Sequence, residues 1–247
     1  MSRLADLQRL YSLLDQRRQQ VGGTQTLGNL GIIRTWTRRG VYFFFEPGED
    51  RCDSGEGPRV VRVGTHALSV GSKSTLRQRL GQHRGSMTGG GNHRGSIFRL
   101  LVGQALLARG DELPCSSWGL MSDIGKASGV LGIERAVLAS AEQPVERAAS
   151  RYLAVMPCLW LDVDDEPGPK SLRALIECNA IALLSNYGRA AIDPPSPSWL
   201  GRFSDRPLVS GSGLWNQRHV KAEHDRTFLS VLEEMINNVG RDYGRVS

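Results

Sequence analysis

The sequence predicts an α+β protein with a small antiparallel sheet of three strands flanked by helices. Three short runs rich in β-branched and aromatic residues, at 40–46, 59–65 and 155–163, predict the strands. Amphipathic segments with apolar residues at helical spacing surround these runs. With 247 residues, 40% of them hydrophobic, the chain can bury a sizeable core. We expect a single enlarged domain over residues 1–247.

The first third of the chain predicts a helix, a hairpin and a basic helix. Leu4–Arg18 carries leucines at helical spacing, and the polar, Gly-rich Val21–Gly31 predicts a loop. The first two β-rich runs are joined by a polar loop, and the first of them ends at Pro47-Gly48, so they predict an antiparallel hairpin. Ser72–Arg84 follows and predicts a strongly basic helix.

The middle of the chain has weaker patterns. Ile97–Leu107 predicts a buried helix, although its period does not exclude a strand. Ile133–Ala141 predicts a strand or turn, and Pro144–Ala154 predicts a helix. After the third β-rich run, Ser171–Leu184 predicts a helix with Ser171 as its N-cap.

The C-terminal part predicts a loop that wraps around the domain, followed by a helix. Ile192 to Pro207 is rich in Pro, Ser and Gly, which favours an extended loop. Apolar residues at helical spacing from Phe228 onward predict a final amphipathic helix.

Composition narrows the function classes. The 31 Lys and Arg exceed the 25 Asp and Glu and give a net charge of +6, which favours an anionic partner such as nucleic acid. The cysteines are widely spaced without a Cys-x-x-Cys pair, which argues against structural zinc and a disulfide framework. No phosphate-loop motif supports ATP use. Since no apolar run approaches about 20 residues and the first residues lack a signal pattern, we expect a cytoplasmic protein without a membrane partner.

Four pieces of the sequence, in order, resemble the signatures of the GIY-YIG nucleases. Gly40-Val41-Tyr42 resembles the first tripeptide, and Arg62-Val63-Gly64 resembles the second with an arginine in place of its tyrosine. Thr75–Leu80 resembles the family's Leu-Arg-x-Arg helix segment. Ala174–Ile181 resembles the family's Ala-Leu-x-x-Glu-x-x-x-Ile helix.

The resemblance implies a GIY-YIG-like core with additions. The matching pieces cover about 40–84 and 155–187. Residues 85–154 are then a long insertion, and residues 188–247 are a C-terminal wrap and helix.

The resemblance also implies an enzyme: a divalent-metal-dependent endonuclease that hydrolyses DNA phosphodiester bonds with Mg²⁺ or Mn²⁺. Tyr42 would position or deprotonate the attacking water, and Arg79 would hold the scissile phosphate through its planar guanidinium. Glu177 would bind the metal ion, which as Mg²⁺ keeps much of its water shell. His83 projects from the same helix face as Arg79, four residues away, and can relay a proton.

The second signature departs from the family pattern. Arg62 replaces its tyrosine, and Thr65-His66 stand where a lysine is frequent, so Arg62 and His66 are candidate supporting residues. Asn186, nine residues after Glu177, is a further supporting candidate for the asparagine that family members place after the metal helix.

Basic, amide and aromatic residues outside these motifs are candidates for holding DNA, because Arg and Lys bind phosphates while Asn, Gln and Arg read base edges. For the loop around Trp215, the alternative is that the tryptophan fills the core. The DNA-binding candidates are Lys73, Arg77, His93, Arg94, Arg99, Trp215, Asn216, Arg218 and His219.

Other interpretations of function stay open. The altered second signature favours a catalytically weakened DNA-binding module, and the terminal amphipathic helices allow a structural interaction protein. By analogy, a restriction or defence nuclease is favoured over a repair subunit. A one-site nuclease needs a homodimer or two visits to cut both strands.

Overall fold

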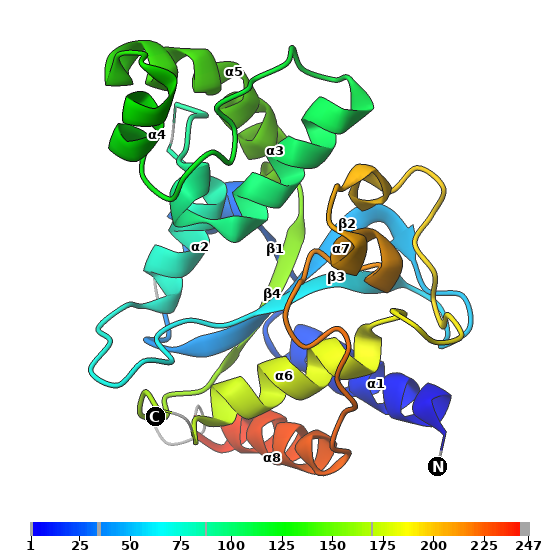
Figure 1. The fold of residues 1–247 in the computed structure, drawn as a ribbon. Helices are drawn as coiled ribbons and strands as arrows, with labels where there is room; N and C mark the ends of the chain where they lie inside the picture. Colours follow the sequence, from blue (N-terminus) through cyan, green and yellow to red (C-terminus); the bar gives the residue numbers. More distant parts are fainter. Residues whose placement is uncertain (1, 34–35, 87, 169, 243–247) are drawn as a thin grey trace.

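A computed structural model describes residues 2–33, 36–86, 88–168 and 170–242, and it has the α+β architecture that the sequence predicts (Figure 1). In chain order the elements are α1 (Arg3–Gln20), β1 (Gln25–Thr26), the 3₁₀ helix η1 (Leu27–Ile32), β2 (Gly40–Asp50), β3 (Pro58–Gly64), α2 (Leu76–Arg84), η2 (His93–Gly95), α3 (Ile97–Arg109), α4 (Ile124–Leu131), α5 (Arg135–Ala154), β4 (Pro157–Asp162), α6 (Leu172–Leu184), η3 (Leu200–Phe203), α7 (Pro207–Ser212) and α8 (Thr227–Asp242).

The sheet has the order β1-β4-β2-β3, and each neighbouring pair is antiparallel. The predicted hairpin and the third strand are present, but the expectation of three strands is wrong by one. β1 is a two-residue strand inside the segment expected to be a loop, and Gln25 lies opposite Cys158 of β4. Its position depends on the free edge of β4, which the composition of the Gly-rich segment does not reveal.

Strand β2 continues to Asp50 instead of ending at Pro47-Gly48. β4 pairs only with Gly40 to Phe44, and the register with β3 shifts after Phe44. Pro47 therefore lies in an irregular stretch beyond the part of β2 that is paired on both sides. A residue without a backbone N–H is tolerated in such a position.

The expectation of a strand or turn at Ile133–Ala141 is wrong, because α5 runs continuously through this region and through Pro144. Leu138, Val145, Ala149 and Leu153 are buried at helical spacing along α5. Burial of this apolar face outweighs the cost that proline brings to a helix interior.

Helix starts differ from the predictions in detail. α2 begins at Leu76, since Thr75 and Gln78 form a reciprocal capping box. Ser171 occupies the N-cap position of α6 as predicted, but its hydroxyl makes no capping hydrogen bond.

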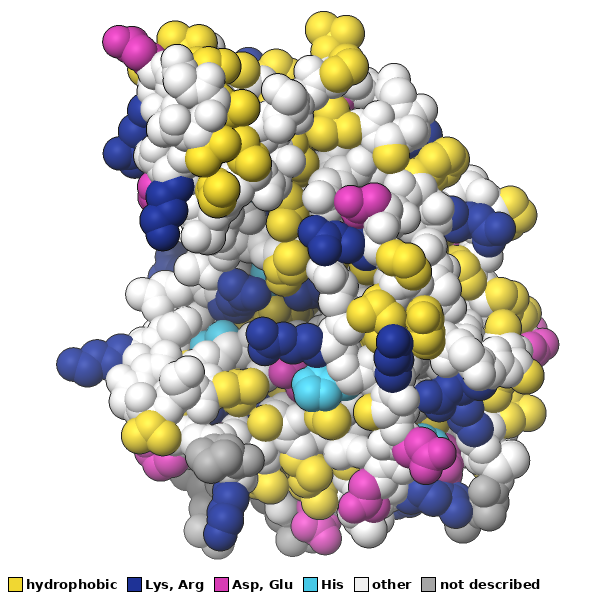
Figure 2. All heavy atoms as spheres, in the orientation of Figure 1, with side chains coloured by type: hydrophobic (Ala, Val, Ile, Leu, Met, Phe, Trp, Pro, Cys, Tyr) yellow, Lys and Arg dark blue, Asp and Glu magenta, His cyan; other side chains and the backbone are white. Residues whose placement is uncertain are grey.

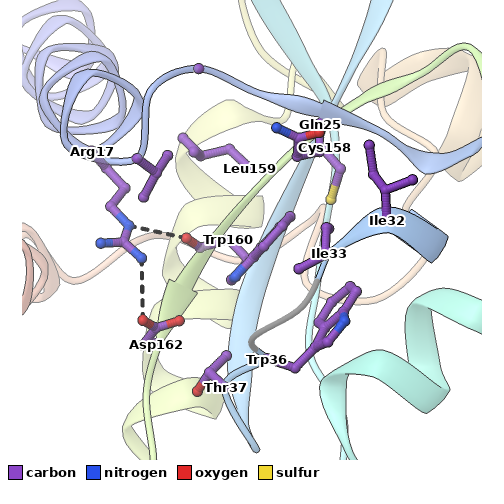
Figure 3. Close-up of a pocket in the computed structure, with 12 residues that line it drawn as sticks. Arg17, Gln25, Ile32, Ile33, Trp36, Thr37, Cys158, Leu159, Trp160 and Asp162 are labelled. Atoms are coloured by element: carbon purple, nitrogen blue, oxygen red, sulfur yellow. Dashed lines mark hydrogen bonds and ion pairs between the residues drawn. The ribbon is translucent and has the colours of Figure 1, made fainter. Parts of the chain in front are cut away.

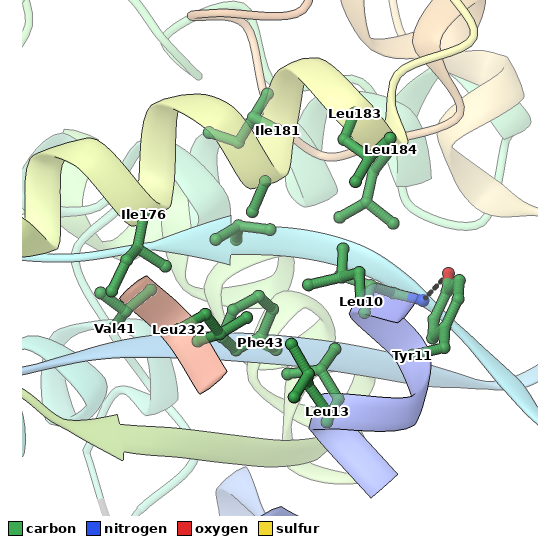
Figure 4. Close-up of a cluster of buried hydrophobic side chains, with 14 of the residues drawn as sticks. Leu10, Tyr11, Leu13, Val41, Phe43, Ile176, Ile181, Leu183, Leu184 and Leu232 are labelled. Atoms are coloured by element: carbon green, nitrogen blue, oxygen red, sulfur yellow. Dashed lines mark hydrogen bonds between the residues drawn. The ribbon is translucent and has the colours of Figure 1, made fainter. Parts of the chain in front are cut away.

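Helices cover both faces of the sheet, so the core has two layers (Figure 1). On one face, Val41 and Phe43 of β2 pack with side chains of α1, α6 and α8 (Figure 4). On the other, Tyr42 and Phe44 pack with side chains of η1, α2, α3 and α5. This alternation explains why the first β-rich run is apolar at successive positions.

None of the helices in the described residues combines the length and apolar character that a bilayer crossing requires.

Candidate functional site

A cleft of about 770 Å³ opens where the end of β3, α2, α6 and the loop 215–219 meet. Figure 2 shows Lys, Arg and His side chains gathered at a hollow in the middle of one face. Several residues that the sequence analysis selected line this cleft, from segments far apart in the chain: Arg62, His66, Arg79, Glu177, Trp215, Asn216, Arg218 and His219.

Glu177 of α6 is the acidic group of the cleft. Its Oε1 accepts a hydrogen bond from the Thr65 backbone N–H at 3.2 Å. Burial raises the pKa of Glu177, and the charges of Arg62, Arg79 and Arg218 oppose this rise together with the Thr65 bond. Within the described residues, the carboxylate has charged neighbours but no ion-pair partner within 4.0 Å.

This donor set fits a magnesium ion. No group of three or more His, Cys, Asp and Glu in the described part of the chain could enclose a metal. Mg²⁺ keeps several waters and is commonly held by only one or two carboxylates together with substrate phosphates. Glu177, on the wall of a cleft large enough for waters, therefore suits Mg²⁺ better than a metal that needs a complete protein cage.

Arg79 lies on the half-exposed face of α2, and the Thr75 capping box fixes the start of that helix. Its Nη1 donates to Gln82 Oε1 at 3.0 Å. The same nitrogen also donates to the Gly95 carbonyl at 3.5 Å. These bonds use two of the five donors of the guanidinium, so an anion in the cleft can still be bound.

Tyr42 and His83 form a buried pair that does not line the cleft. The Tyr42 hydroxyl lies 2.9 Å from His83 Nε2, and His83 Nδ1 lies 2.8 Å from Ser96 Oγ. Burial, then the charges of Arg79, Arg62 and Arg99, hold the pKa of His83 well below 6.5, so the ring is neutral at pH 7. A neutral imidazole donates through one nitrogen and accepts through the other.

The pKa of Tyr42 responds to the residues of the cleft. Burial raises it, and the charges of Arg62 and Arg79 oppose this rise. The phenol oxygen is therefore coupled electrostatically to the two cations that line the cleft.

Gly64 gives a steric reason for glycine in the second signature. It lies opposite Tyr42 across the β2–β3 pair, and a Cβ at Gly64 would be 2.4 Å from the phenol oxygen. The Tyr42 ring thus occupies the space that any side chain at position 64 would need.

His66 lines the cleft with a neutral imidazole ring whose two nitrogens are in different environments. Its Nδ1 lies 3.1 Å from the Ser74 carbonyl, which can only accept, so Nδ1 carries the proton. Burial, then the charge of Arg173, lowers the pKa of His66 to about 4. Its Nε2 is buried without a hydrogen-bond partner in the described structure.

Three sequence candidates lie outside the cleft in a buried ion-pair network. Arg99 donates to Glu146 Oε2 from Nε at 3.0 Å, and His93 Nδ1 lies 2.9 Å from Glu146 Oε1. Arg94 binds both carboxylate oxygens of Glu142, at 2.6 and 2.8 Å. These residues hold α3 and η2 to α5, and their charges are paired within the protein.

Three further candidates have structural partners. Trp215 is fully buried and donates from Nε1 to Glu46 at 3.1 Å, which is the core-filling alternative considered above. Asn216 binds both the N–H and the carbonyl of Val63, at 3.1 and 2.8 Å, and so covers the free edge of β3. Asn186 is not in the cleft lining and accepts hydrogen bonds from α1 and from a nearby backbone N–H.

The remaining basic candidates are accessible. Arg218 and His219 are exposed at the rim of the cleft, and His219 Nδ1 lies 3.3 Å from Cys178 Sγ. Lys73 and Arg77 are exposed near the start of α2 but do not line the cleft.

Sequence reasoning missed Ser96, which connects His83 to α3. Its Oγ accepts from the Arg99 backbone N–H at 3.3 Å as the N-cap of α3. A serine directly before an apolar helix is an N-cap signal, so this position could have been found, although its contact with His83 could not.

A second cavity of about 590 Å³ shares no lining residue with the cleft (Figure 3). Trp36 and Trp160 stack beside it with ring centroids 5.3 Å apart, and Arg17 pairs with Asp162. Among the described residues that line it, Arg17 and Asp162 are the charged ones, and they are paired with each other.

Comparison with known proteins gives one match. Residues 1–241 match a family model described as a GIY-YIG domain. The matched range includes residues 85–154 and nearly all of the C-terminal wrap. No curated protein and no solved structure matches the chain.

Proposed function

The chain belongs to the GIY-YIG family, whose members are generally endonucleases, and from this premise we propose that it hydrolyses DNA phosphodiester bonds with a divalent metal ion. The observation that carries the proposal is the convergence of Arg79 and Glu177 on one cleft, with both charges acting on the buried Tyr42 of the Tyr42–His83 pair. The resemblance assigned these four residues to catalysis, and they come from β2, α2 and α6.

Arg79 would bind the scissile phosphate. Hydrolysis builds negative charge on the phosphate oxygens, and a cation already fixed in place stabilises that charge without reorganisation. The capping box and the Gln82 bond keep Arg79 on the cleft wall before substrate arrives. A permanently charged, planar fork suits two phosphate oxygens better than a flexible ammonium does.

Tyr42 would orient the attacking water, or take its proton while its own O–H proton passes to His83 Nε2. Neutral His83 can accept the Tyr42 O–H through Nε2 while Nδ1 donates to Ser96, and this arrangement leaves the phenol oxygen lone pairs available. Arg62 and Arg79 favour the ionised form of the phenol, whereas burial disfavours it. Bound substrate would then determine whether the Tyr42 phenol is protonated or ionised.

Glu177 would hold Mg²⁺, which when bound supplies charge neutralisation for the leaving oxygen. The Thr65 N–H fixes one carboxylate oxygen and so determines the direction of the other. His66 lines the same cleft and adds no positive charge to it, because its ring is neutral at pH 7.

The test is cleavage of supercoiled plasmid and bacteriophage DNAs with Mg²⁺, with and without chelator. We expect metal-dependent cleavage by the wild type and a loss of at least about 100-fold in Glu177→Gln, which keeps the shape of the side chain but removes its charge. Glu234→Gln on the exposed face of α8 is the matched control and should cleave normally. Wild-type protein that never cleaves, or Glu177→Gln that cleaves fully, would contradict the proposal.

The replacement of the second signature tyrosine by Arg62 favours one alternative, a DNA-binding module with weak or no catalysis. The same assay separates the two functions when binding is measured in parallel. Salt-sensitive DNA binding that survives Glu177→Gln, without cleavage by the wild type, would identify the binding module.

A further inference from the structure

Arg62 is the exception among the buried arginines of the described chain. Six arginines are at most 5% exposed, and five of them lie within 4.0 Å of a carboxylate. Arg62 has no such partner. The five paired arginines are Arg17, Arg39, Arg59, Arg99 and Arg173.

The contacts of Arg62 hold its guanidinium in place without a carboxylate within 4.0 Å among the described residues, and Glu177 acts on its charge only from a greater distance. One terminal nitrogen donates to the Trp215 carbonyl, and the guanidinium carbon lies 4.6 Å from the centre of the Phe98 ring. Its Nε is buried without a hydrogen-bond partner among the described residues. A buried cation without a counter-charge is costly, and this cost is recovered only when an anion arrives.

The cleft has more positive than negative side chains, which also favours an anionic ligand. Arg62, Arg79 and Arg218 line it together with one carboxylate, Glu177. Burial lowers the pKa of Arg62, and the opposing effects of the Tyr42 phenol and the Glu177 carboxylate do not cancel this decrease. A magnesium ion on Glu177 would make the excess of positive charge larger.

We propose that Arg62 is a second phosphate-binding residue, which together with Arg79 binds phosphate oxygens of the nucleic-acid backbone. The inference rests on the proposed function, since it assumes that the cleft receives a nucleic-acid strand. It gives the arginine that replaces the second signature tyrosine a role in binding substrate. Two guanidiniums on one cleft can bind two neighbouring phosphates or two oxygens of one phosphate.

The test measures binding of a short DNA duplex without divalent metal, so that no cleavage occurs, by fluorescence anisotropy over a range of KCl concentrations. Each phosphate contact contributes about 0.9 to the slope of log K against log[salt]. Arg62→Gln should lower that slope by about 0.9 and weaken binding about 10- to 100-fold at 0.1 M salt. Arg62→Lys should keep the slope and still bind more weakly, because the planar fork is lost.

Arg147→Gln is the matched control, because it removes an exposed arginine of α5 that does not line the cleft. Its slope and affinity should equal those of the wild type. Folded Arg62→Gln with the slope and affinity of the wild type would overturn the inference.

Because Arg62 is buried, its glutamine variant could fail to fold, so a second measurement is included. Inorganic phosphate should raise the melting temperature of the wild type more than chloride at equal ionic strength. A phosphate-specific rise that is smaller in Arg62→Lys than in the wild type would support the inference, because the lysine keeps the charge but loses the planar fork. A rise equal to that of the wild type would overturn it.

Failure of the two proposals can be told apart. A wild type that binds DNA through Arg62 but never cleaves would contradict the nuclease and leave the phosphate site standing. A wild type that cleaves, with an Arg62→Gln variant that binds and cleaves equally well, would overturn the phosphate site alone.

Discussion

Replacing Gly64 with alanine tests whether the Tyr42 ring is held against a bare backbone. An alanine Cβ would lie 2.4 to 2.6 Å from three atoms of the Tyr42 ring and hydroxyl. Tyr42 is 1% exposed and bonded to His83 at 2.9 Å, so it cannot move aside freely. Overpacking of this kind costs about 1–3 kcal/mol, and loss of the His83 hydrogen bond adds about 1 kcal/mol.

Alanine also restricts the unfolded chain, which returns up to about 1 kcal/mol. The net expectation for Gly64→Ala is a loss of about 2 kcal/mol in the free energy of unfolding. For a chain of this size, that loss corresponds to a melting temperature about 4–8 °C lower. Cleavage should also fall, since the phenol no longer occupies its place beneath the cleft.

Urea and thermal unfolding of both proteins measure this loss directly. Gly81→Ala is the matched control, because it makes the same substitution within α2 where nothing lies within 4 Å of the new Cβ. Helix propensity predicts that this control is more stable than the wild type by up to about 1 kcal/mol. If Gly64→Ala unfolds at the wild-type temperature or above, the Tyr42 ring does not fill the space and the steric argument fails.

Three further predictions follow from the contacts. Tyr42→Phe should lower cleavage at least about 100-fold while costing only about 1 kcal/mol of stability, as measured by kinetics and urea unfolding. Arg94→Gln should lower the free energy of unfolding by about 3–5 kcal/mol, because it breaks the buried pair with Glu142. The DNA affinity of the folded variant should equal that of the wild type, and a loss of affinity without a loss of stability would identify Arg94 as a DNA ligand. His66 binds a proton below about pH 6.5 in the unfolded state but only near pH 4 in the folded state, so the free energy of unfolding should fall as the pH drops through this window. Urea unfolding at pH 7 and pH 5 should show a smaller fall for His66→Gln than for the wild type.

The elements that carry the site were predictable because local signals specify them. The β-rich runs of the hairpin, the basic helix and the apolar spacing around Glu177 each have a short-range pattern. The order of the signature pieces then placed Arg79 and Glu177 together, and the structure brings both to one cleft.

The roles of the other basic residues were not predictable, because charge pairing depends on partners far away in the chain. Arg94 and Arg99 lie close together in the sequence, in a segment with several basic residues. Their partners Glu142 and Glu146 are 48 and 47 residues further on. A count of charges cannot distinguish a solvated arginine from one that holds two helices together. β1 was not predictable for the same reason, because its two residues form a strand by pairing with β4, which is far away in the sequence.

The segments outside the signature pieces directly contact the residues proposed to react with DNA, so they are better regarded as part of the candidate site than as additions to it. From residues 85–154, Ser96 binds His83, and Arg99 donates to the His83 carbonyl at 3.1 Å. From the C-terminal wrap, the Trp215 carbonyl accepts from Arg62. Residues 85–154 therefore orient His83 of the Tyr42–His83 pair, and the C-terminal wrap orients Arg62 of the cleft. The signature pieces alone do not provide these contacts. A chain without either segment would keep the side chains of the candidate site but lose the contacts that fix their direction. A preorganised site depends on that fixed direction.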